Sequence, residues 1–445
     1  MKFFFILGFA SFFSFSSLAQ FPSFHTSIYD STAVRGYFFL VSYTGHLLIL
    51  DQKGEIVYVK SLDSNDSDFK IEPNGLMTYF YDGQFRLMDS TFTVVDSIAC
   101  KDCETDWHEI KILPNGNTMI LGRETVTMDL SKYRIRGRQG SDTAKVSAGL
   151  IQEFDQRRQV VFDWRAKDHF LFDDVDTARD IFASPLINWT HLNSFDIDRD
   201  GNILLSSRFF KEITKINRRN GSIMWRMGGK HNQFTWIDPQ SGAEPTPVSF
   251  NLQRNIRVLP NGNISFLELS KKGTRGVEIN LDEKKKTATE VWRCIYDSTL
   301  VSGLGGSVQR LKNSNTLLDF GFFTNQSEHL AFVMVDSLCR PLFRVSGSRA
   351  FRTYYYDSLP FLLPRPQMVC FDSLGIKYLK TQQPYDSYLW NDSISSPVVE
   401  VTHPGNYQVL VPCGENGFIY SEKWVVADLS VPCPIEKKPP LQKNK

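Results

Sequence analysis

The sequence of 445 residues lacks an excess of charge of either sign, because 50 Lys and Arg stand against 49 Asp and Glu for a formal net charge of +1. Its only basic block is the short run 284–286. This balance excludes the positive surface that binds a nucleic-acid duplex or an anionic membrane. Disorder is excluded as well, because 13% aromatic and only 22% charged residues supply enough apolar surface for a folded core.

Beyond the first twenty residues the sequence lacks any apolar run near the roughly 20 residues that a membrane-spanning helix needs. Residues 1–19 combine Lys2, a Phe-rich apolar stretch and the small residues Ser17 and Ala19. This pattern predicts a signal peptide cleaved after Ala19. A membrane anchor is the alternative, but the stretch is short and no Cys follows the cleavage site to carry a lipid. We expect no transmembrane segment and a mature protein that is periplasmic, secreted or at the cell surface.

Cysteines are few, seven in all. Two of the three residues Cys370, Cys413 and Cys433 are expected to form a disulfide. The sequence Cys100-Lys-Asp-Cys103 allows a redox motif, half of a zinc site or a local disulfide. The local disulfide is favoured, since no second pair stands at metal-ligand spacing and no βαβ pattern surrounds it. We predict no metal site and no cofactor.

Helical periodicity is nearly absent, and short runs rich in Val, Ile, Phe and Tyr alternate with Asn-Gly and Asp-Gly turns, which is typical of an all-β protein. One hairpin recurs, made of a strand, a tight turn and a second strand. Its copies lie at 110–121, 194–205, 256–266 and 308–318, with a weaker copy at 71–79.

A second element, a strand ending in an aromatic or apolar pair, follows each hairpin. It occurs six times, at 56–59, 94–95, 160–164, 223–226, 290–293 and 342–345. Six copies predict a six-bladed β-propeller over residues 34–356. The spacing between copies is long, so we expect inserts such as 167–189 and 230–249 to form loops over one face, where function usually lies.

The chain changes character after a stretch with three prolines at 360, 364 and 366. From there, residues 366–433 read as short alternating strands with a turn at Pro404-Gly405, which predicts a small β-sandwich. This segment is similar to the immunoglobulin-like modules of exported Bacteroidetes proteins. The Lys- and Pro-rich residues 434–445 are expected to be a disordered tail.

Polar residues recur at one position of the repeat. Eight residues before the turn Gly, or the Ser that replaces it in the last copy, stand His108, Asn193, Arg254 and Gly306. If the first strand of each hairpin is innermost, these positions converge at one end of the propeller channel. Further candidates lie within a few residues of them: His191, Gln253 and Gln309.

Convergent His, Arg, Asn and Gln side chains suit an oxyanion, whose oxygens need several hydrogen-bond donors in a partly desolvated pocket. Trp107, Trp189 and Trp236 are candidates to wall the site and to stack on an aromatic ligand. The alternative is structural, since propeller channels are polar because water fills them and a His at a strand start often serves the scaffold.

Two sequence blocks resemble the bacterial arylsulfotransferases, which are propeller enzymes. The first is Asn188-Trp-Thr-His-Leu-Asn-Ser with its continuation to Arg208, and the second is 216–229, ending Trp-Arg-Met-Gly-Gly. The segments 106–111 and 306–317 support the resemblance, which covers roughly residues 34–356.

The resemblance implies a six-bladed propeller that moves a sulfuryl group from a phenolic sulfate ester to a phenol without a nucleotide donor. The expected ligands are therefore small aryl sulfates and phenols. In the family a channel His is transiently sulfated while other His and Arg residues hold the sulfate. His191 and His108 are accordingly the candidate catalytic residues, and Asn193, Arg208, Gln253, Arg254 and Gln309 the candidate substrate-binding residues.

The sequence departs from the family in two places. Arg254 follows Gln253 where the family typically has His, and 298–306 holds no His to accept the sulfuryl group. Arg binds a sulfate but, being always protonated, cannot accept a sulfuryl group. Either His191 or His108 is then the nucleophile, or the protein is a non-catalytic propeller that binds a sulfated or other anionic ligand.

Overall fold

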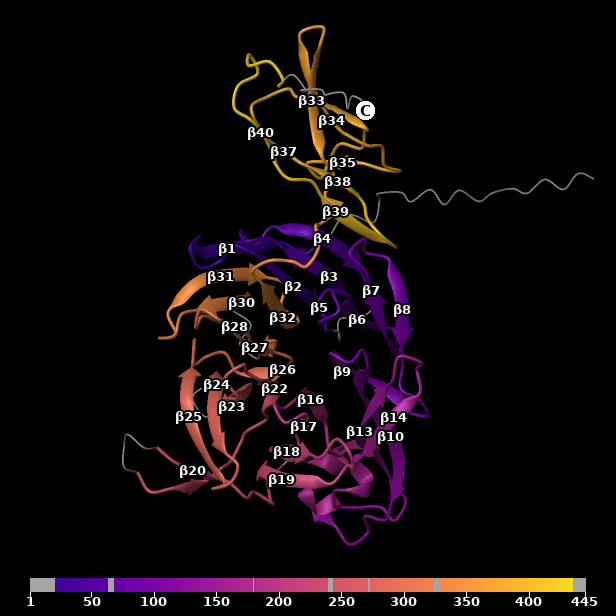
Figure 1. Ribbon diagram of the computed structural model, residues 1–445, viewed down its shortest axis with the longest axis vertical. Coiled ribbons are helices and arrows are strands. Elements are labelled where there is room, and N and C mark those ends of the chain that lie inside the picture. Colours follow the sequence, from indigo (N-terminus) through magenta and orange to yellow (C-terminus); the bar gives the residue numbers. More distant parts are fainter. Residues whose placement is uncertain are drawn as a thin grey trace, which may run out of the picture.

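The computed structural model describes residues 21–62, 68–178, 180–238, 243–270, 273–323 and 329–434. Its main body consists of six sheets set around a central axis, each containing one blade of four antiparallel strands, and further strands extend four of the sheets at their edges (Figure 1). The predicted all-β fold and six-bladed propeller are confirmed. The predicted signal peptide and residues 435–445 of the predicted tail lie outside the described residues.

Each blade runs from an innermost strand at the axis to an outermost strand at the rim. The first blade consists of β32 (Ala350–Tyr356), β2 (Tyr37–Ser42), β3 (His46–Leu50) and β4 (Ile56–Ser61). The second consists of β5 (Lys70–Ile71), β6 (Met77–Tyr81), β7 (Gln84–Met88) and β8 (Val94–Ile98). The third consists of β9 (Glu104–Ile112), β10 (Thr118–Met128), β13 (Ala144–Phe154) and β14 (Val160–Arg165).

The remaining three blades follow the same order. The fourth blade consists of β16 (Leu192–Ile197), β17 (Ile203–Ser207), β18 (Glu212–Ile216) and β19 (Ile223–Gly228). The fifth consists of β22 (Arg254–Val258), β23 (Ile264–Ser270), β24 (Gly273–Asp282) and β25 (Thr287–Cys294). The sixth consists of β27 (Ser307–Arg310), β28 (Thr316–Asp319), β30 (Leu330–Val335) and β31 (Pro341–Gly347). The tight turn after the innermost strand places Gly116, Gly201 and Gly262 at φ of 81°, 82° and 88°, which favours glycine.

Short elements fill the connections between the blade strands. They are β11 (Arg134–Ile135), β12 (Arg138–Gln139), η2 (Ala166–Asp168), η3 (Phe172–Asp174), η4 (Ile181–Ala183), β15 (Leu186–Asn188), β20 (Thr235–Trp236), β21 (Thr246–Pro247), β26 (Ser302–Leu304) and β29 (Phe322–Phe323). No helix among the described residues is long and apolar enough to cross a membrane.

The two ends of the propeller chain close the ring. The N-terminal strand β1 (Phe24–Tyr29) pairs with β31 of the last blade, and β32, the last propeller strand, pairs with β2 of the first. Figure 1 shows β1 in indigo beside β31 in orange. The propeller therefore begins at β1, ten residues before the predicted start at 34, because β1 adds a fifth strand to the outer edge of the last blade from the other end of the chain.

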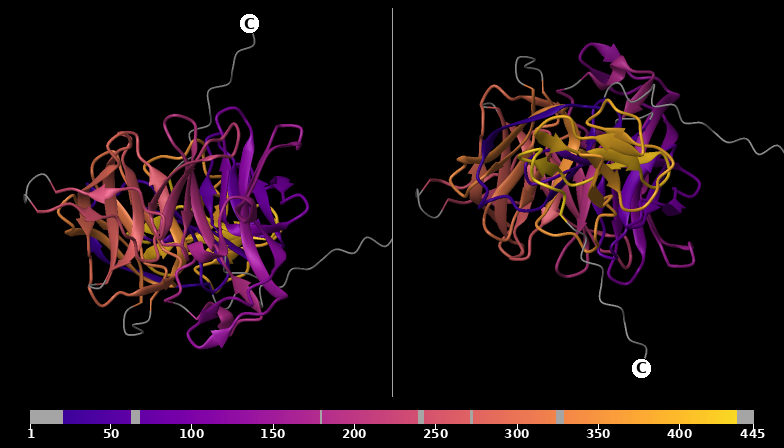
Figure 2. Two further views of the ribbon diagram at one scale, coloured as in Figure 1. Left: turned by 90° about the horizontal axis from the view of Figure 1, so that it is seen from below. Right: turned by 90° about the horizontal axis from the view of Figure 1, so that it is seen from above.

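The C-terminal region stands on the rim of the first blade (Figures 1 and 2). Its strands are β33 (Met368–Ser373), β34 (Ile376–Thr381), β35 (Leu389–Trp390), β36 (Val398–Glu400), β37 (Gly405–Tyr407), β38 (Val409–Pro412), β39 (Gly417–Tyr420) and β40 (Trp424–Val426). Strand β39 pairs with β4, so β35, β38 and β39 continue the first blade as one sheet. The immunoglobulin-like character of 366–433 stays a prediction.

Three disulfides join Cys100 to Cys103, Cys294 to Cys339 and Cys370 to Cys433, and Cys413 is a buried free thiol. The local disulfide at 100–103 agrees with the sequence, and 370–433 settles which two of the three C-terminal cysteines pair. The bridge from Cys294, at the end of β25, to Cys339, just before β31, was not foreseen, because 45 residues separate the two cysteines.

Apolar side chains pack between neighbouring blades, and one such contact lies across the closure of the ring. Phe38 on β2 is fully buried and stacks on Phe343 of β31, with ring centroids 5.2 Å apart. Blade-to-blade packing of this kind keeps the chain ends together, because it buries apolar area that an open ring would expose.

Replacing Phe38 by Ala removes this packing and leaves a cavity at the closure. We expect the free energy of unfolding to fall by about 3–5 kcal/mol, seen as a lower urea midpoint followed by circular dichroism. The matched control is Leu171→Ala at a side chain that is 67% exposed, where a change within about 0.5 kcal/mol is expected. Equal effects of the two variants would contradict the importance of this contact.

Candidate functional site

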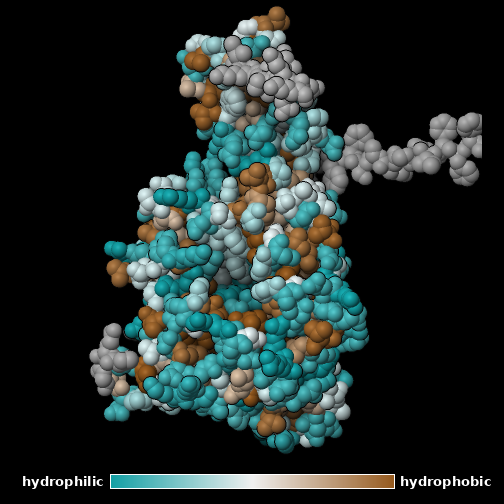
Figure 3. Space-filling view, viewed as in Figure 1, coloured by the Kyte–Doolittle hydropathy of each residue, from teal (hydrophilic) through white to brown (hydrophobic). Residues whose placement is uncertain are grey.

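A small pocket lies at the centre of the ring, where the innermost strands of five blades meet. It is lined by His108, His191, Asn193, Arg208, Arg254, Leu304, Gly305, Gly306, Phe351 and Arg352. All four residues found by aligning the repeat on its turn are among them. The space is narrow and holds roughly one water-sized group beside these side chains. In Figure 3 the molecular surface is hollowed near the centre of the ring.

The innermost strands are irregular where they carry the site residues. On β9 the pairing with β10 jumps from Thr105 to Ile110, so the segment 106–109 bulges away from its partner. Bulges also occur at Asn193 of β16 and within 254–257 of β22. A β-bulge re-aims side chains that a regular ladder would alternate between the two faces. Each bulge thus turns polar side chains towards the axis.

His108 is buried and is held by the carboxylate of Asp106. Nδ1 of His108 lies 2.5 Å from Oδ1 of Asp106, which also accepts the His108 backbone N–H at 2.9 Å. Burial acts to raise the pKa of Asp106, but the charge and hydrogen bonds of His108 outweigh it and lower that pKa. Since an ionised carboxylate only accepts hydrogen bonds, Nδ1 is the donor. Nε2 has no hydrogen-bond partner among the described residues.

His191 precedes β16 and has a positive φ of 45°, an uncommon backbone conformation for this residue type. Its Nδ1 lies 2.9 Å from the amide nitrogen of Asn188. Because that amide donates, Nδ1 of the neutral ring accepts and Nε2 carries the proton. The rings of His191 and His108 lie edge to face, with centroids 5.4 Å apart. The two histidines therefore present opposite hydrogen-bonding characters.

Arg254 is a buried guanidinium without a carboxylate partner among the described residues. Its Nη1 donates to the hydroxyl of Ser302 at 3.1 Å and to the carbonyl of Gly305, and its Nη2 reaches the carbonyl of Ser302 at 3.5 Å. Burial, then the charges of Arg208 and Arg352, lower the pKa of Arg254 well below its ordinary value. A bound anion would counter both effects, which makes this the strongest sign of an anion site.

Two more predicted residues lie in the pocket wall. Arg208 follows β17 and donates from Nη2 to the carbonyl of Gly303 at 2.8 Å. Asn193 lies within the bulge of β16 and uses its amide nitrogen to bind the carbonyl of Gln253 at 2.8 Å. Arg208 adds positive charge to the pocket, whereas the Asn193 amide nitrogen already has a backbone partner.

Arg352 is a site residue that the sequence did not reveal. It comes from β32 and is only 2% exposed. Its guanidinium lies 3.2 Å from the carboxylates of Asp68 and Glu109 and donates to the carbonyls of His108 and Asn193 at 2.7 Å each. Burial opposes its charge, yet Asp68 and Glu109 raise the pKa of Arg352. Unlike Arg254, it is neutralised.

Next to Arg352, a network of ion pairs centred on Glu109 lies near the axis. Glu109 is fully buried and binds Lys70 and Arg257, each at 2.8 Å. Burial acts to raise the pKa of Glu109, but Arg257, Lys70 and Arg352 outweigh it and hold the pKa well below its usual range. These cations are therefore balanced by carboxylates, in contrast to Arg254 in the pocket.

Gly305 and Gly306 form a wall of bare backbone. Their φ angles are 68° and 98°, and a Cβ at Gly306 would lie 2.6 Å from a side-chain carbon of Leu267. A side chain at 305 or 306 is therefore disfavoured by conformation and by space.

A second hollow adjoins the pocket and shares both histidines with it. Trp107, Arg123 and Asn188 contribute to its lining. The Trp107 ring stacks on His108 with centroids 5.1 Å apart, and the Arg123 guanidinium lies 4.8 Å from the Trp107 ring centroid. Of the three tryptophans expected to wall the site, only Trp107 does so, since Trp189 is buried in the core between blades and Trp236 packs near the rim.

Gln253 and Gln309 do not line the pocket, so they are not placed to bind substrate as the sequence suggested. The amide nitrogen of Gln253 binds the carbonyls of Ser207 and Glu212 at 3.1 and 2.9 Å. Gln309 exchanges two hydrogen bonds with the backbone of Tyr355, at 2.9 and 2.7 Å. Both side chains tie strands together, because backbone groups at the blade edges need partners when buried.

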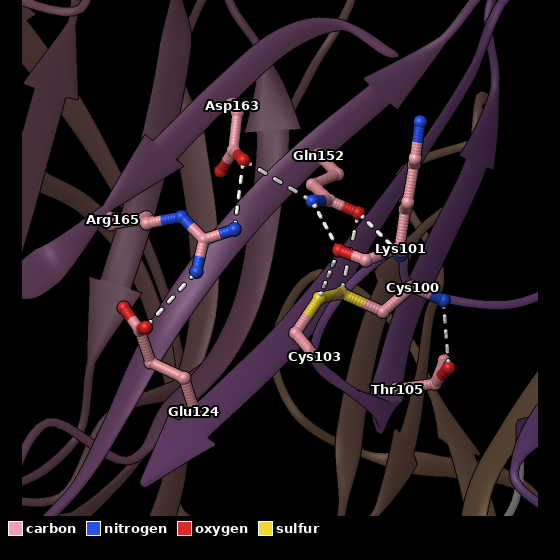
Figure 4. Close-up of a disulfide and its surroundings, with 8 residues drawn as sticks. All are labelled: Cys100, Lys101, Cys103, Thr105, Glu124, Gln152, Asp163 and Arg165. Carbon is pink, nitrogen blue, oxygen red and sulfur yellow. Dashed lines mark hydrogen bonds and ion pairs between the residues drawn. A yellow bond between two sulfur atoms is a disulfide. The ribbon is translucent and has the colours of Figure 1, made fainter. Parts of the chain in front are cut away.

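The disulfide of Cys100 and Cys103 fixes the approach to β9 (Figure 4). The amide of Gln152 on β13 bridges the loop, accepting from the Lys101 N–H at 2.8 Å and donating to the Lys101 carbonyl at 3.0 Å. The Cys100 N–H binds the hydroxyl of Thr105 at 2.9 Å. These contacts anchor the strand immediately before the bulge that holds Asp106 and His108.

Asp319 lies behind the glycine wall and faces Arg352 from the last blade. Its carboxyl accepts hydrogen bonds from the Gly321 N–H and the Thr353 hydroxyl, both at 2.7 Å. Burial raises its pKa to about 7 from 3.8, although these hydrogen bonds and Arg352 oppose the rise. Between those two values the folded protein keeps a proton that the unfolded chain has released.

The contribution of Asp319 to stability should therefore decrease as the pH rises from about 4 to about 7, by up to roughly 1.4 kcal/mol per pH unit. Asp319→Asn should remove this part of the pH dependence and be more stable than the parent at pH 8, as measured by urea unfolding at several pH values. Asp102→Asn, at an exposed loop carboxylate, is the control. Parallel pH profiles for the parent and Asp319→Asn would contradict the assignment.

Comparison with known proteins identifies the family. The arylsulfotransferase (ASST) family model matches residues 25–337. No curated protein matches the sequence. Similar solved structures include a Bacteroides caccae protein of unknown function, with 13% identity, coverage of 72% of this chain and 98% of that chain, and a TM-score of 0.45. They also include a streptogramin B lyase, with 10% identity, coverage of 80% and 94%, and a TM-score of 0.37. Because the family model spans well over half of the sequence, this chain belongs to the arylsulfotransferase family.

Proposed function

We propose that the protein transfers a sulfuryl group from a phenolic sulfate ester to a phenol, without a nucleotide donor, with His108 as the attacking residue. The observation that carries the proposal is the pairing of an unneutralised buried cation, Arg254, with a histidine held by a carboxylate in the same pocket. Arg254 suits the binding of the sulfate group, and the histidine held by a carboxylate suits nucleophilic attack on sulfur.

The anion subsite consists of Arg254, Arg208 and the Nε2–H of His191. Three donors of this kind match the three terminal oxygens of a sulfate ester, and in a desolvated pocket each such hydrogen bond is strong. The aryl group would lie in the adjoining hollow beside Trp107, whose ring offers a flat apolar surface. The two histidines lie between the anion subsite and the aryl hollow, where the bond from sulfur to the aryl oxygen would break.

Asp106 favours His108 over His191 as the nucleophile. It holds the proton on Nδ1, so the lone pair is on Nε2, and its negative charge stabilises the positive ring that forms during the reaction. His191 has the opposite tautomer, with its proton on Nε2, and serves as a donor. This division supports His108 rather than His191 as the nucleophile, a choice that the sequence left open.

The reaction then needs no oxidant or cofactor. Nε2 of His108 attacks sulfur, the bond from sulfur to the aryl oxygen breaks, and the released phenolate takes a proton from water. The acceptor phenol gives its proton to the hydroxide left by that step and attacks the same sulfur, and the electron pair of the N–S bond returns to Nε2. One sulfate ester and one phenol give one phenol and one sulfate ester.

A second function rests on Arg254 itself. Where the family typically has His, this guanidinium binds an anion but cannot accept a sulfuryl group. A propeller that binds sulfated or other anionic ligands without turnover is therefore the competing proposal. The two differ in whether a phenol is released.

We also infer export to the periplasm, the cell surface or the medium. The predicted signal peptide at 1–19 supports this location, and so do three disulfides, which persist in oxidising compartments.

The transfer reaction is tested with a chromogenic aryl sulfate and a phenol acceptor. We expect chromophore release that requires the acceptor, a fall in kcat of roughly a thousandfold or more for His108→Ala, and a fall of roughly 10²–10⁴-fold for Asp106→Asn. His169→Ala, at a ring stacked on Trp164 away from the pocket, is the control. A folded protein that turns over no donor with any phenol would favour the binding function.

The covalent step is tested by mass spectrometry. Protein exposed to the aryl sulfate without an acceptor should carry one SO3 group on His108, and a phenol should discharge it. The adduct should be absent from His108→Ala and present in His191→Gln at a lower rate of formation. An adduct on His191 would contradict the assigned division, and turnover without any adduct would indicate direct transfer between donor and acceptor.

A further inference from the structure

A second pocket lies far from the axis, where the C-terminal region meets the first two blades. It has a cavity volume of about 180 Å³, which is small for a ligand pocket and limits any occupant to a compact molecule. Its chemistry comes from Lys60 at the end of β4, Tyr79 and Tyr81 on β6, and Arg86 on β7. Glu415, in the turn between β38 and β39, borders it.

The pocket exists because of the pairing between β39 and β4. Gly417 pairs with Lys60, which brings the turn 413–416 over the second blade. Tyr79 pairs with Arg86 across β6 and β7, so both side chains lie on the same face of that blade. Figure 1 shows β39 beside β4 at the base of the C-terminal region.

The two cations have no carboxylate within ion-pair distance among the described residues. Lys60 is only 7% exposed, and its Nζ lies 5.6 Å from the centroid of the Tyr79 ring. The guanidinium of Arg86 lies 6.0 Å from the centroid of the Tyr81 ring. Burying an ammonium group without an anion is costly, and the faces of aromatic rings compensate it only in part.

The state of Lys60 agrees with this geometry. Burial lowers its pKa, Arg86 lowers it further, and Glu415 opposes both. Glu415 is exposed at the rim and leaves the inner end of the pocket with the positive charge. Apolar contact comes from Leu62 and Val94, which pack against the same core.

We propose that this pocket binds a small aryl or alkyl molecule through its oxyanion group, which lies between Lys60 and Arg86. The oxyanion supplies the negative charge that the two cations lack, and the apolar part of the ligand contacts Val94, Leu62 and the ring of Tyr81. The site does not depend on sulfuryl transfer and is separate from the pocket at the axis.

The test uses 4-nitrobenzenesulfonate, whose sulfur is bonded to carbon and cannot be transferred. Isothermal titration calorimetry of the full chain should detect two sites. Lys60→Met, which keeps the apolar stem, should weaken one of them at least tenfold, and Arg254→Gln should weaken the other. Lys132→Met, at an exposed lysine lying over Tyr133, is the matched control and should change neither.

Glu415→Gln gives a test that does not disturb a buried residue. Removing the carboxylate from the rim should tighten binding at the outer site a few-fold, because the pocket becomes more positive. A single site that survives Lys60→Met and disappears in Arg254→Gln would overturn the proposal and leave the transfer function intact. A single site with the reverse behaviour would support this pocket and count against the anion site at the axis.

Discussion

One guanidinium, that of Arg352, joins the parts on which the site depends. It binds backbone carbonyls from the third and fourth blades and carboxylates from the second and third, while its own strand completes the first. A buried arginine with all of these partners fixes the distances between inner strands that share no hydrogen-bonded ladder. Arg352 is neutralised by its carboxylate partners, whereas its neighbour Arg254 has no carboxylate partner among the described residues, and this difference is what the proposed anion site depends on.

The sequence was sufficient for most of the fold, since tight turns and alternating strands are local signals. The six outer strands expected from the second element of the repeat correspond to β4, β8, β14, β19, β25 and β31. What could not be read locally was the closure, in which β32 supplies the innermost strand of the first blade and β1 adds an outer strand to the last blade. Nor did alternation reveal that β39 would extend the first blade, because edge pairing depends on which strand edge is left open.

The same contrast applies to the site. His108, Asn193, Arg254 and Gly306 were found from one position of the repeat, since equivalent positions on inner strands must converge at the axis. Arg352 was missed because no hairpin turn follows β32 in the sequence, so this strand could not be aligned with the repeat. Gln253 and Gln309 were selected as neighbours of these positions, but they do not line the pocket, because alternation along a strand turns such neighbours away from the axis. The role of Asp106 depends on a bulge, which has no sequence signature here.

The closure of the ring also sets the order in which the site can form during synthesis. His108, His191 and Arg254 leave the ribosome before Arg352, which closes the first blade with a strand from the end of the propeller. Until that strand is available, the second, third and fourth blades have no common partner at the axis. A chain that is interrupted before residue 352, or folded in part while it is still being exported, therefore carries the histidines of the site without the residue that links their blades at the axis. If the pocket binds anions as proposed, that binding depends on the last strand of the propeller being in place.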